Sequence, residues 1–199
     1  MNRILGLILV LCVVFASTQA LQAGEPQTKE GTKALFWGFN GLSDLSIDNS
    51  TIGFLYNISD GVGLWGALGL NIGSSKIDDN DHLSTTGVDF AVGAKLNMFQ
   101  TEPVAMFISP MVTIGTSSTE DKSASSTFID SEMTLGIGAA IGAEWWFANN
   151  VSFSASTFLG FVTETMTEER GENKDEHTKT NIGTMANYGA HFTLSFYFR

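Results

Sequence analysis

The feature that most constrains the fold of this chain is an unbroken alternation of apolar with small or polar residues from Glu132 to Phe147. One set of positions holds Met133, Leu135, Ile137, Ala139, Ile141, Ala143, Trp145 and Phe147, and the other set is rich in glycine. A period of two indicates a β-strand, because successive side chains of a strand point to opposite faces. At about 16 residues, the segment is far longer than the usual strand of a soluble protein. This length suits a tilted strand that crosses a membrane and extends beyond it.

The same alternation recurs along most of the chain and predicts eight strands. They are expected at Leu35–Asn40, Thr51–Ile58, Val62–Gly73, Ser84–Phe99, Pro103–Thr116, Glu132–Phe147, Val151–Thr163 and Thr184–Phe198. The connections alternate in length. Short turns are expected at Asn57–Gly61, Gln100–Pro103 and Ala148–Asn150, and longer polar loops at Ser43–Ser50, Ser74–Leu83, Ser117–Ser126 and Met166–Gly183. The predicted fold class is all-β, an eight-stranded antiparallel up-and-down transmembrane β-barrel with both termini on the short-turn, periplasmic side.

A secreted soluble β-sandwich or a lipocalin-like barrel would show the same alternation, so the direction of the apolar face needs other evidence. The apolar faces carry no charge along their central stretches, and the opposite faces are rich in Gly, Ala and Ser. Small residues suit a narrow barrel interior. Aromatic residues near the predicted strand ends resemble a membrane-interface girdle, at Trp37, Trp145, Phe147, Phe153, Phe196 and Phe198. These features favour a barrel whose apolar face meets lipid.

The first 23 residues have the pattern of a secretory signal peptide. Met1–Arg3 carries a positive charge, Ile4–Ala16 is apolar, and Ser17–Ala23 is small and polar apart from Leu21. Cleavage is expected after Ala20 or Ala23, which assigns residues 1–23 to the signal and 24–199 to the barrel domain. An uncleaved membrane anchor is the alternative. The one cysteine, Cys12, lies in this segment, so a closed sheet in a membrane is expected to stabilise the exported chain without disulfides.

The net charge excludes one class of partner. The formal charge is −11, and no basic patch is present that would meet phosphates, so no nucleic acid is expected as a partner. Beyond the signal segment the chain has no apolar run of about 18 residues, and no transmembrane helix is expected.

Two segments resemble a known family. Ala34–Leu45, with the sequence ALFWGFNGLSDL, is similar to the opening strand of small bacterial outer-membrane β-barrel proteins of the OmpX/OmpA-like superfamily. The alternating C-terminal residues resemble the assembly signal of that superfamily, at Phe192, Leu194, Phe196 and Phe198. The resemblance implies an integral bacterial outer-membrane protein surrounded by lipid and lipopolysaccharide, with the barrel-assembly machinery as a partner. The family usually ends on the aromatic residue, whereas here Arg199 follows Phe198.

Ionisable residues are expected on the lumen face at Asp89, Lys95, Glu132, Glu144 and His191. Lys95 and Glu144 are expected near the periplasmic end, on two strands that are separated by a third. Because an unpaired charge in a narrow interior is costly, these residues are expected to form a polar network. A salt-bridge network that fills the barrel and a polar plug or proton-linked gate are both compatible with this pattern.

No catalytic, cofactor or metal site is predicted, and the chain is not expected to be an enzyme. His82 and His177 fall in predicted loops while His191 faces the lumen, and no Gly-x-Ser-x-Gly motif is present. Three dispersed histidines give no metal constellation. The acidic run Asp78–Asp81 lacks the spacing of an EF-hand loop, so a solvated loop is favoured over a calcium site.

The long acidic loops are the expected functional surface, because loops carry contacts while strands act as a scaffold. The residues predict a structural or surface-interacting, adhesin-like barrel with an unknown surface ligand, and a final hairpin that protrudes. Eight strands enclose a space filled by side chains, so a wide porin-like channel is not expected. A channel for small solutes or hydrophobic ligands is the alternative. An outer-membrane lipid-modifying enzyme is a further alternative, since members of the superfamily include a few such enzymes.

Overall fold

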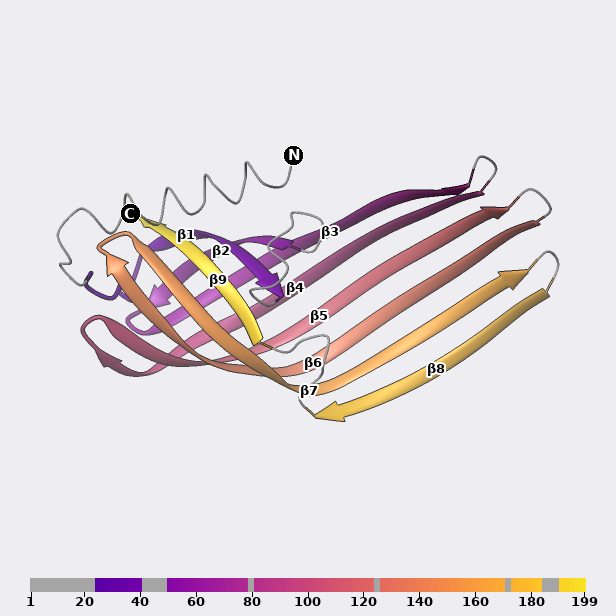
Figure 1. The fold of residues 1–199 in the computed structure, drawn as a ribbon. Helices are drawn as coiled ribbons and strands as arrows, with labels where there is room; N and C mark the ends of the chain where they lie inside the picture. Colours follow the sequence, from indigo (N-terminus) through magenta and orange to yellow (C-terminus); the bar gives the residue numbers. More distant parts are fainter. Residues whose placement is uncertain (1–23, 41–49, 79–80, 124–125, 171–172, 184–189) are drawn as a thin grey trace.

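The computed structural model describes residues 24–40, 50–78, 81–123, 126–170, 173–183 and 190–199 (Figure 1). The predicted signal peptide lies outside these residues. The described strands are β1 (Lys33–Asn40), β2 (Ser50–Ser59), β3 (Val62–Asp78), β4 (Asp81–Thr101), β5 (Val104–Ser123), β6 (Ser126–Ala148), β7 (Val151–Arg170), β8 (Asn173–Gly183) and β9 (Ala190–Phe198). Within this part of the chain, no helix has both the length and the apolar character needed to cross a membrane.

Backbone pairing closes eight strand positions into a ring. The order is β1, β2, β3, β4, β5, β6, β7 and β9, with β9 paired back to β1, and neighbouring strands run antiparallel. The closing pair runs from Lys33 opposite Phe198 to Asn40 opposite His191. Closure leaves no unpaired edge within the ring, which is what a sheet inside a membrane requires. The predicted eight-stranded antiparallel barrel is confirmed.

Strands β8 and β9 share the eighth position, and this division differs from the prediction. The half of β7 that begins at Val151 pairs with β9, and the half from Gly160 to Arg170 pairs with β8. One continuous strand was expected over Thr184–Phe198. The described strand begins at Ala190, and residues 184–189 lie outside the described part of the chain.

Three segments predicted as loops are strands, and the prediction is wrong there. Pairing of β3 with β4 continues to Asp78 opposite Asp81, and pairing of β5 with β6 continues to Ser123 opposite Ser126. Pairing of β7 with β8 continues to Arg170 opposite Asn173. These stretches are rich in serine, threonine and charge on both faces. The apolar alternation stops where lipid stops, but the backbone ladder continues, because threonine and serine fit a strand that has water on both sides.

The three long hairpins therefore extend far beyond the ring. Figure 1 shows β3–β4, β5–β6 and β7–β8 reaching well past the ends of β1, β2 and β9. We call this region the projecting sheet; it comprises residues 70–78, 81–88, 116–123, 126–133, 165–170 and 173–178. Pairing of β2 with β3 stops at Gly69, so Leu70–Asp78 has a partner on one side only among the described strands. The same holds for β8.

The outer surface of the ring is apolar, as the alternation predicts. Ile137, Ile52 and Leu68 are 60%, 66% and 47% exposed. Further exposed large apolar side chains surround the barrel, among them Leu35, Phe54, Leu64, Phe90, Val92, Met106, Val112, Leu135, Ile141, Leu159, Phe161 and Phe196. A continuous belt of this size is unfavourable in water and suits a surface covered by lipid.

The interior is filled by large side chains that lie over glycines of neighbouring strands. A Cβ at Gly93 would stand 2.8 Å from the indole of Trp65, and one at Gly142 would stand 2.6 Å from the ring of Phe107. Phe158 covers Gly138 in the same way, at 2.6 Å. The glycines of the lumen face thus leave the space that the aromatic side chains occupy.

Candidate functional site

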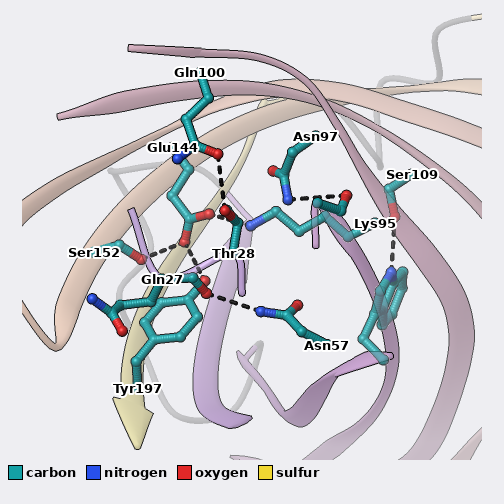
Figure 2. Close-up of polar contacts among 12 residues, drawn as sticks. Gln27, Thr28, Asn57, Lys95, Asn97, Gln100, Ser109, Glu144, Ser152 and Tyr197 are labelled. Atoms are coloured by element: carbon teal, nitrogen blue, oxygen red, sulfur yellow. Dashed lines mark hydrogen bonds and ion pairs between the residues drawn. The ribbon is translucent and has the colours of Figure 1, made fainter. Parts of the chain in front are cut away.

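A cluster of polar side chains converges on Glu144 near the short-turn end of the barrel (Figure 2). Glu144 lies on β6 and is 1% exposed. Its carboxylate forms an ion pair with the ammonium of Lys95 on β4 and accepts a hydrogen bond from Ser152 on β7. Tyr197 on β9 donates a further hydrogen bond at 2.8 Å. Four strands are therefore joined through one carboxylate, and we call these four residues the floor cluster.

The charges of the floor cluster cancel. Lys95 also lies 4.7 Å from the ring centroid of Phe107 and 5.9 Å from that of Trp146. Rings in this position stabilise a buried ammonium through their negative faces. Two hydrogen bonds and one ion pair satisfy the oxygens of Glu144, which is the condition under which a buried ion pair is tolerated.

Below the floor cluster, a segment without regular structure crosses the end of the barrel. We call Gly24–Thr32 the strap. Its first residue, Gly24, donates a backbone hydrogen bond to Trp146 at 3.0 Å, and the carbonyl of Thr28 accepts one from Gly61 at 2.8 Å. The side chain of Thr28 donates to Gln100 at 2.8 Å, and the carbonyl of Gln27 accepts from Asn57 at 2.9 Å.

The two anchors of the strap lie on opposite sides of the ring. Trp146 is on β6 and Asn57 is on β2, which are four positions apart in a ring of eight. Thr28 and Thr32 are buried, at 7% and 1% exposure. The strap therefore lies across the short-turn end as a second layer beneath the floor cluster.

Above the floor cluster the barrel encloses a cavity of about 330 Å³. Lys95 and Tyr197 line its lower part. Its wall is formed mainly by apolar side chains, which include Phe36, Leu55, Trp65, Phe107 and Phe158. The indole nitrogen of Trp65 donates to Ser109 at 2.8 Å, which fixes the ring against β5.

The upper part of this cavity is acidic. Asp89, Glu132 and Glu164 line it, and His191 lines the cavity from β9, where it is opposite Ser156 of β7. Asp89 precedes Lys95 by six positions on β4, which corresponds to roughly 20 Å along a strand. Glu132 accepts a hydrogen bond from Thr134 at 3.3 Å, and Glu164 accepts one from Asn181 at 3.5 Å. We call Asp89, Glu132 and Glu164 the acidic mouth.

The five predicted lumen residues do not form one network. The structure brings Lys95 and Glu144 into contact, and it places Asp89 and Glu132 near enough to repel each other. His191 is separate from both pairs; its Nδ1 lies 3.4 Å from the hydroxyl of Thr193, and its ring is seated against Gly38. The polar residues of the interior thus divide into a neutral floor and an acidic mouth.

Sequence reasoning missed three parts of the site. Tyr197 and Ser152 occupy lumen-facing positions of the alternation, but that pattern does not pair them with Glu144. The strap has no periodicity, so its place across the barrel end had no signal in the sequence. The side chains of Asp78–Asp81 lie outside the described residues. Elsewhere in the described ranges, no group of three or more histidine, cysteine, aspartate or glutamate side chains is arranged to hold a metal ion.

The C-terminal residues that resemble an assembly signal lie on β9. Phe196 and Phe198 are 49% and 44% exposed and belong to the apolar belt. The ring of Phe198 lies 6.5 Å from that of Phe54, and Phe192 stacks between Phe39 and Phe153 at centroid distances of 6.5 and 5.7 Å. These contacts join β9 to the strands near the barrel seam on the outer surface.

These observations define a class: a small, closed up-and-down β-barrel with an apolar exterior and a filled interior, the architecture implied by the resemblance to the OmpX/OmpA-like superfamily. Two solved structures are similar in fold. The attachment invasion locus protein Ail of Yersinia pestis is 11% identical with a TM-score of 0.47, and the comparison covers 85% of this chain and 99% of that one. The N-terminal β-barrel domain of Pseudomonas aeruginosa OprF is 16% identical with a TM-score of 0.40, covering 85% and 98%. No family model and no curated protein matches the chain.

Proposed function

We propose that this protein is an integral barrel of the bacterial outer membrane whose projecting sheet takes part in surface interactions. The observation that carries the proposal is the projecting sheet itself, which extends beyond the closed ring and, among the described strands, has one free edge on β3 and one on β8. A scaffold that needed only to span a membrane would not require paired strands far beyond its apolar belt. No catalytic role and no cofactor are proposed.

The orientation follows from the two ends of the barrel. The strap, Arg199 and the three short turns lie at one end, and the projecting sheet extends from the other. Export through the inner membrane delivers such a chain from the periplasm, and short turns face that side in barrels of this kind. We therefore assign the termini to the periplasm and the projecting sheet to the cell exterior.

The two free edges differ in chemistry. β8 carries Lys174, Asp175, Glu176 and Lys179, and charged side chains on an edge discourage further strand pairing. Leu70–Ser75 of β3 carries no charge, and Leu70 and Ile72 are 50% and 67% exposed. An extended segment of a partner protein can add to such an edge through backbone hydrogen bonds. The β3 edge is the proposed contact surface.

The test uses charge on this edge. Cells that express the parent protein should adhere to protein-coated surfaces more strongly than cells with an empty vector. The double variant Ile72→Lys and Ser74→Lys should lose this adhesion, because lysine on the edge opposes strand addition. The matched control, Thr116→Lys with Ser118→Lys, places the same charge inside the projecting sheet and should retain adhesion. No adhesion by the parent, or equal loss in both variants, contradicts the proposal.

A further inference from the structure

We propose that the interior cavity is a binding site for a small organic cation with an apolar body, such as an aromatic or alkyl amine. The cavity, its apolar wall and the acidic mouth carry this inference. It is independent of the surface role of the projecting sheet.

The size and wall of the cavity suit the body of such a ligand. A volume of about 330 Å³ is at the lower end of the range for small-molecule sites. Phe36 and Trp65 meet edge to face, with centroids 6.2 Å apart and an interplanar angle of 74°. Aromatic walls of this kind favour apolar groups and also attract cations to their faces.

The charge of the cavity selects for a cation. Asp89, Glu132 and Glu164 are acidic, and Lys95 is the one lysine or arginine among the lining residues. The ammonium of Lys95 is already paired with Glu144, so it does not offset the acidic mouth. Apolar walls concentrate the field of such charges, which raises the local concentration of cations.

Asp89 lies in the acidic mouth and has no counter-ion among the described side chains. Its carboxylate lies over Gly115 on β5 and near Gly69 on β3, in space that any larger residue at Gly115 would occupy. Among the described residues it makes no hydrogen bond or ion pair, and Glu132 repels it. An ammonium between these two carboxylates would relieve that repulsion.

A second polar group also lacks a partner. Thr113 lines the cavity, and its buried hydroxyl has no hydrogen-bond partner within the described part of the chain. Buried hydroxyl groups are nearly always hydrogen-bonded, so this hydroxyl is free to pair with a polar atom of a water molecule or a ligand in the cavity. An N–H of the ligand would complete it.

The inner face of the projecting sheet continues the negative field outward. Asp130, Glu168 and Asp175 are register neighbours on β6, β7 and β8, two positions beyond Glu132 along β6. Lys179 of β8 lies on the same face, opposite Glu164, so acidic side chains outnumber the basic one along the path of a cation that approaches from the exterior. Such steering raises the rate of association and weakens as salt is added.

The experiment compares three probes that share one aromatic body. The full chain in lipid nanodiscs is dialysed to equilibrium against 1-naphthylmethylammonium, 1-naphthylmethanol or 1-naphthylacetate, and empty nanodiscs supply the baseline for partition into lipid. The cation should bind more tightly than the neutral alcohol, by roughly fivefold for each carboxylate at contact distance in water. The anion should bind least. Equal affinity for the cation and the alcohol overturns the proposal.

Two variants locate the site. Asp89→Asn with Glu132→Gln should remove most of the preference for the cation and leave binding of the alcohol unchanged. Glu102→Gln removes a charge at the short-turn end and should change nothing. Ala91→Phe fills the cavity from β4 and should lower binding of both probes; heat-modifiable gel mobility checks that it is folded. If Ala91→Phe is misfolded, the carboxylate variants alone decide the result, and an unchanged preference in them contradicts the site.

Discussion

Lys95 and Glu144 form an ion pair across the floor of the barrel, although β5 lies between their strands. The side chain of Glu144 is 1% exposed and that of Lys95 is 13% exposed. Glu144 is thus closed off from solvent, and Lys95 borders only the interior cavity. The pair therefore links β4 to β6 at the short-turn end of the barrel.

Removal of one member of this pair should be strongly destabilising. Glu144→Gln leaves the ammonium of Lys95 buried without a counter-ion, and Tyr197 and Ser152 lose a charged acceptor. We expect the free energy of unfolding to fall by about 3–5 kcal/mol. Urea-induced unfolding in detergent micelles, followed by tryptophan fluorescence, measures the change.

An exposed ion pair of the projecting sheet supplies the control. Lys174 and Glu169 lie 3.5 Å apart with side chains 61% and 46% exposed. Glu169→Gln should change the free energy of unfolding by less than about 1 kcal/mol, because water screens this pair. A cost for Glu144→Gln no larger than that of Glu169→Gln would show that the floor cluster contributes little to stability.

The contrast between lipid and lumen explains which parts of the fold were predictable. In the ring, one face of each strand meets lipid and the other meets a packed interior. The sequence of β6 therefore alternates within the ring, and this part of β6 was predicted as a strand. In the projecting sheet both faces meet water, and alternation disappears from Ser117 to Ser123 although the ladder continues. The prediction therefore detected where the membrane begins and ends and mistook that boundary for the end of the strands.

The candidate site was predictable only in part, for a similar reason. The alternation placed Lys95 and Glu144 on the lumen face. Both are close to a short turn in the sequence, so both were expected near the same end of the barrel. The partnership of Tyr197 and Ser152 with Glu144 depends on the β7–β9 register, in which Ser152 is opposite Ser195. The strap contacts depend on a segment with no repeating pattern. Neither the β7–β9 register nor the strap contacts can be read from the local sequence pattern.

Glycine on the lumen face should be replaceable only where no side chain covers it. A Cβ at Gly93 would meet the carbonyl oxygen of Pro110 at 2.6 Å and the indole of Trp65 at 2.8 Å. Gly93→Ala should therefore cost about 1–3 kcal/mol of unfolding free energy through overpacking. Chemical unfolding of the purified barrel measures this cost.

Gly73 is the matched control for this substitution. It lies in the same sheet, and the nearest atom to a Cβ there is Cβ of Thr85 at 3.9 Å. Gly73→Ala should be neutral within about 0.5 kcal/mol or slightly stabilising, because alanine restricts the unfolded chain. Equal effects at the two glycines would mean that the aromatic side chains do not depend on the space at Gly93.

The last aromatic residue should matter more than the arginine after it. Phe198 pairs with Lys33 at the seam of the ring and contacts Phe54 at a centroid distance of 6.5 Å. Phe198→Ala should lower the amount of protein in the outer-membrane fraction, while deletion of Arg199 should change little, because Arg199 is exposed and lies outside β9. Immunoblots of membrane fractions compare the two with the parent. Equal membrane levels for Phe198→Ala and the parent would contradict this prediction.

Loss of the strap should leave the barrel folded but less well sealed. The strap covers the short-turn end through contacts with β2, β4 and β6, and none of its residues belongs to the ring. A chain refolded without Gly24–Lys29 should keep its heat-modifiable gel mobility, because the eight-strand ladder is intact. Its ion conductance in planar bilayers should rise above that of the parent, since only the floor cluster then separates the cavity from the solution at the short-turn end. Asn57→Ala, which removes one anchor of the strap, should produce a smaller rise. If the truncated barrel conducts no better than the parent, the floor cluster alone seals the barrel and the strap has another role.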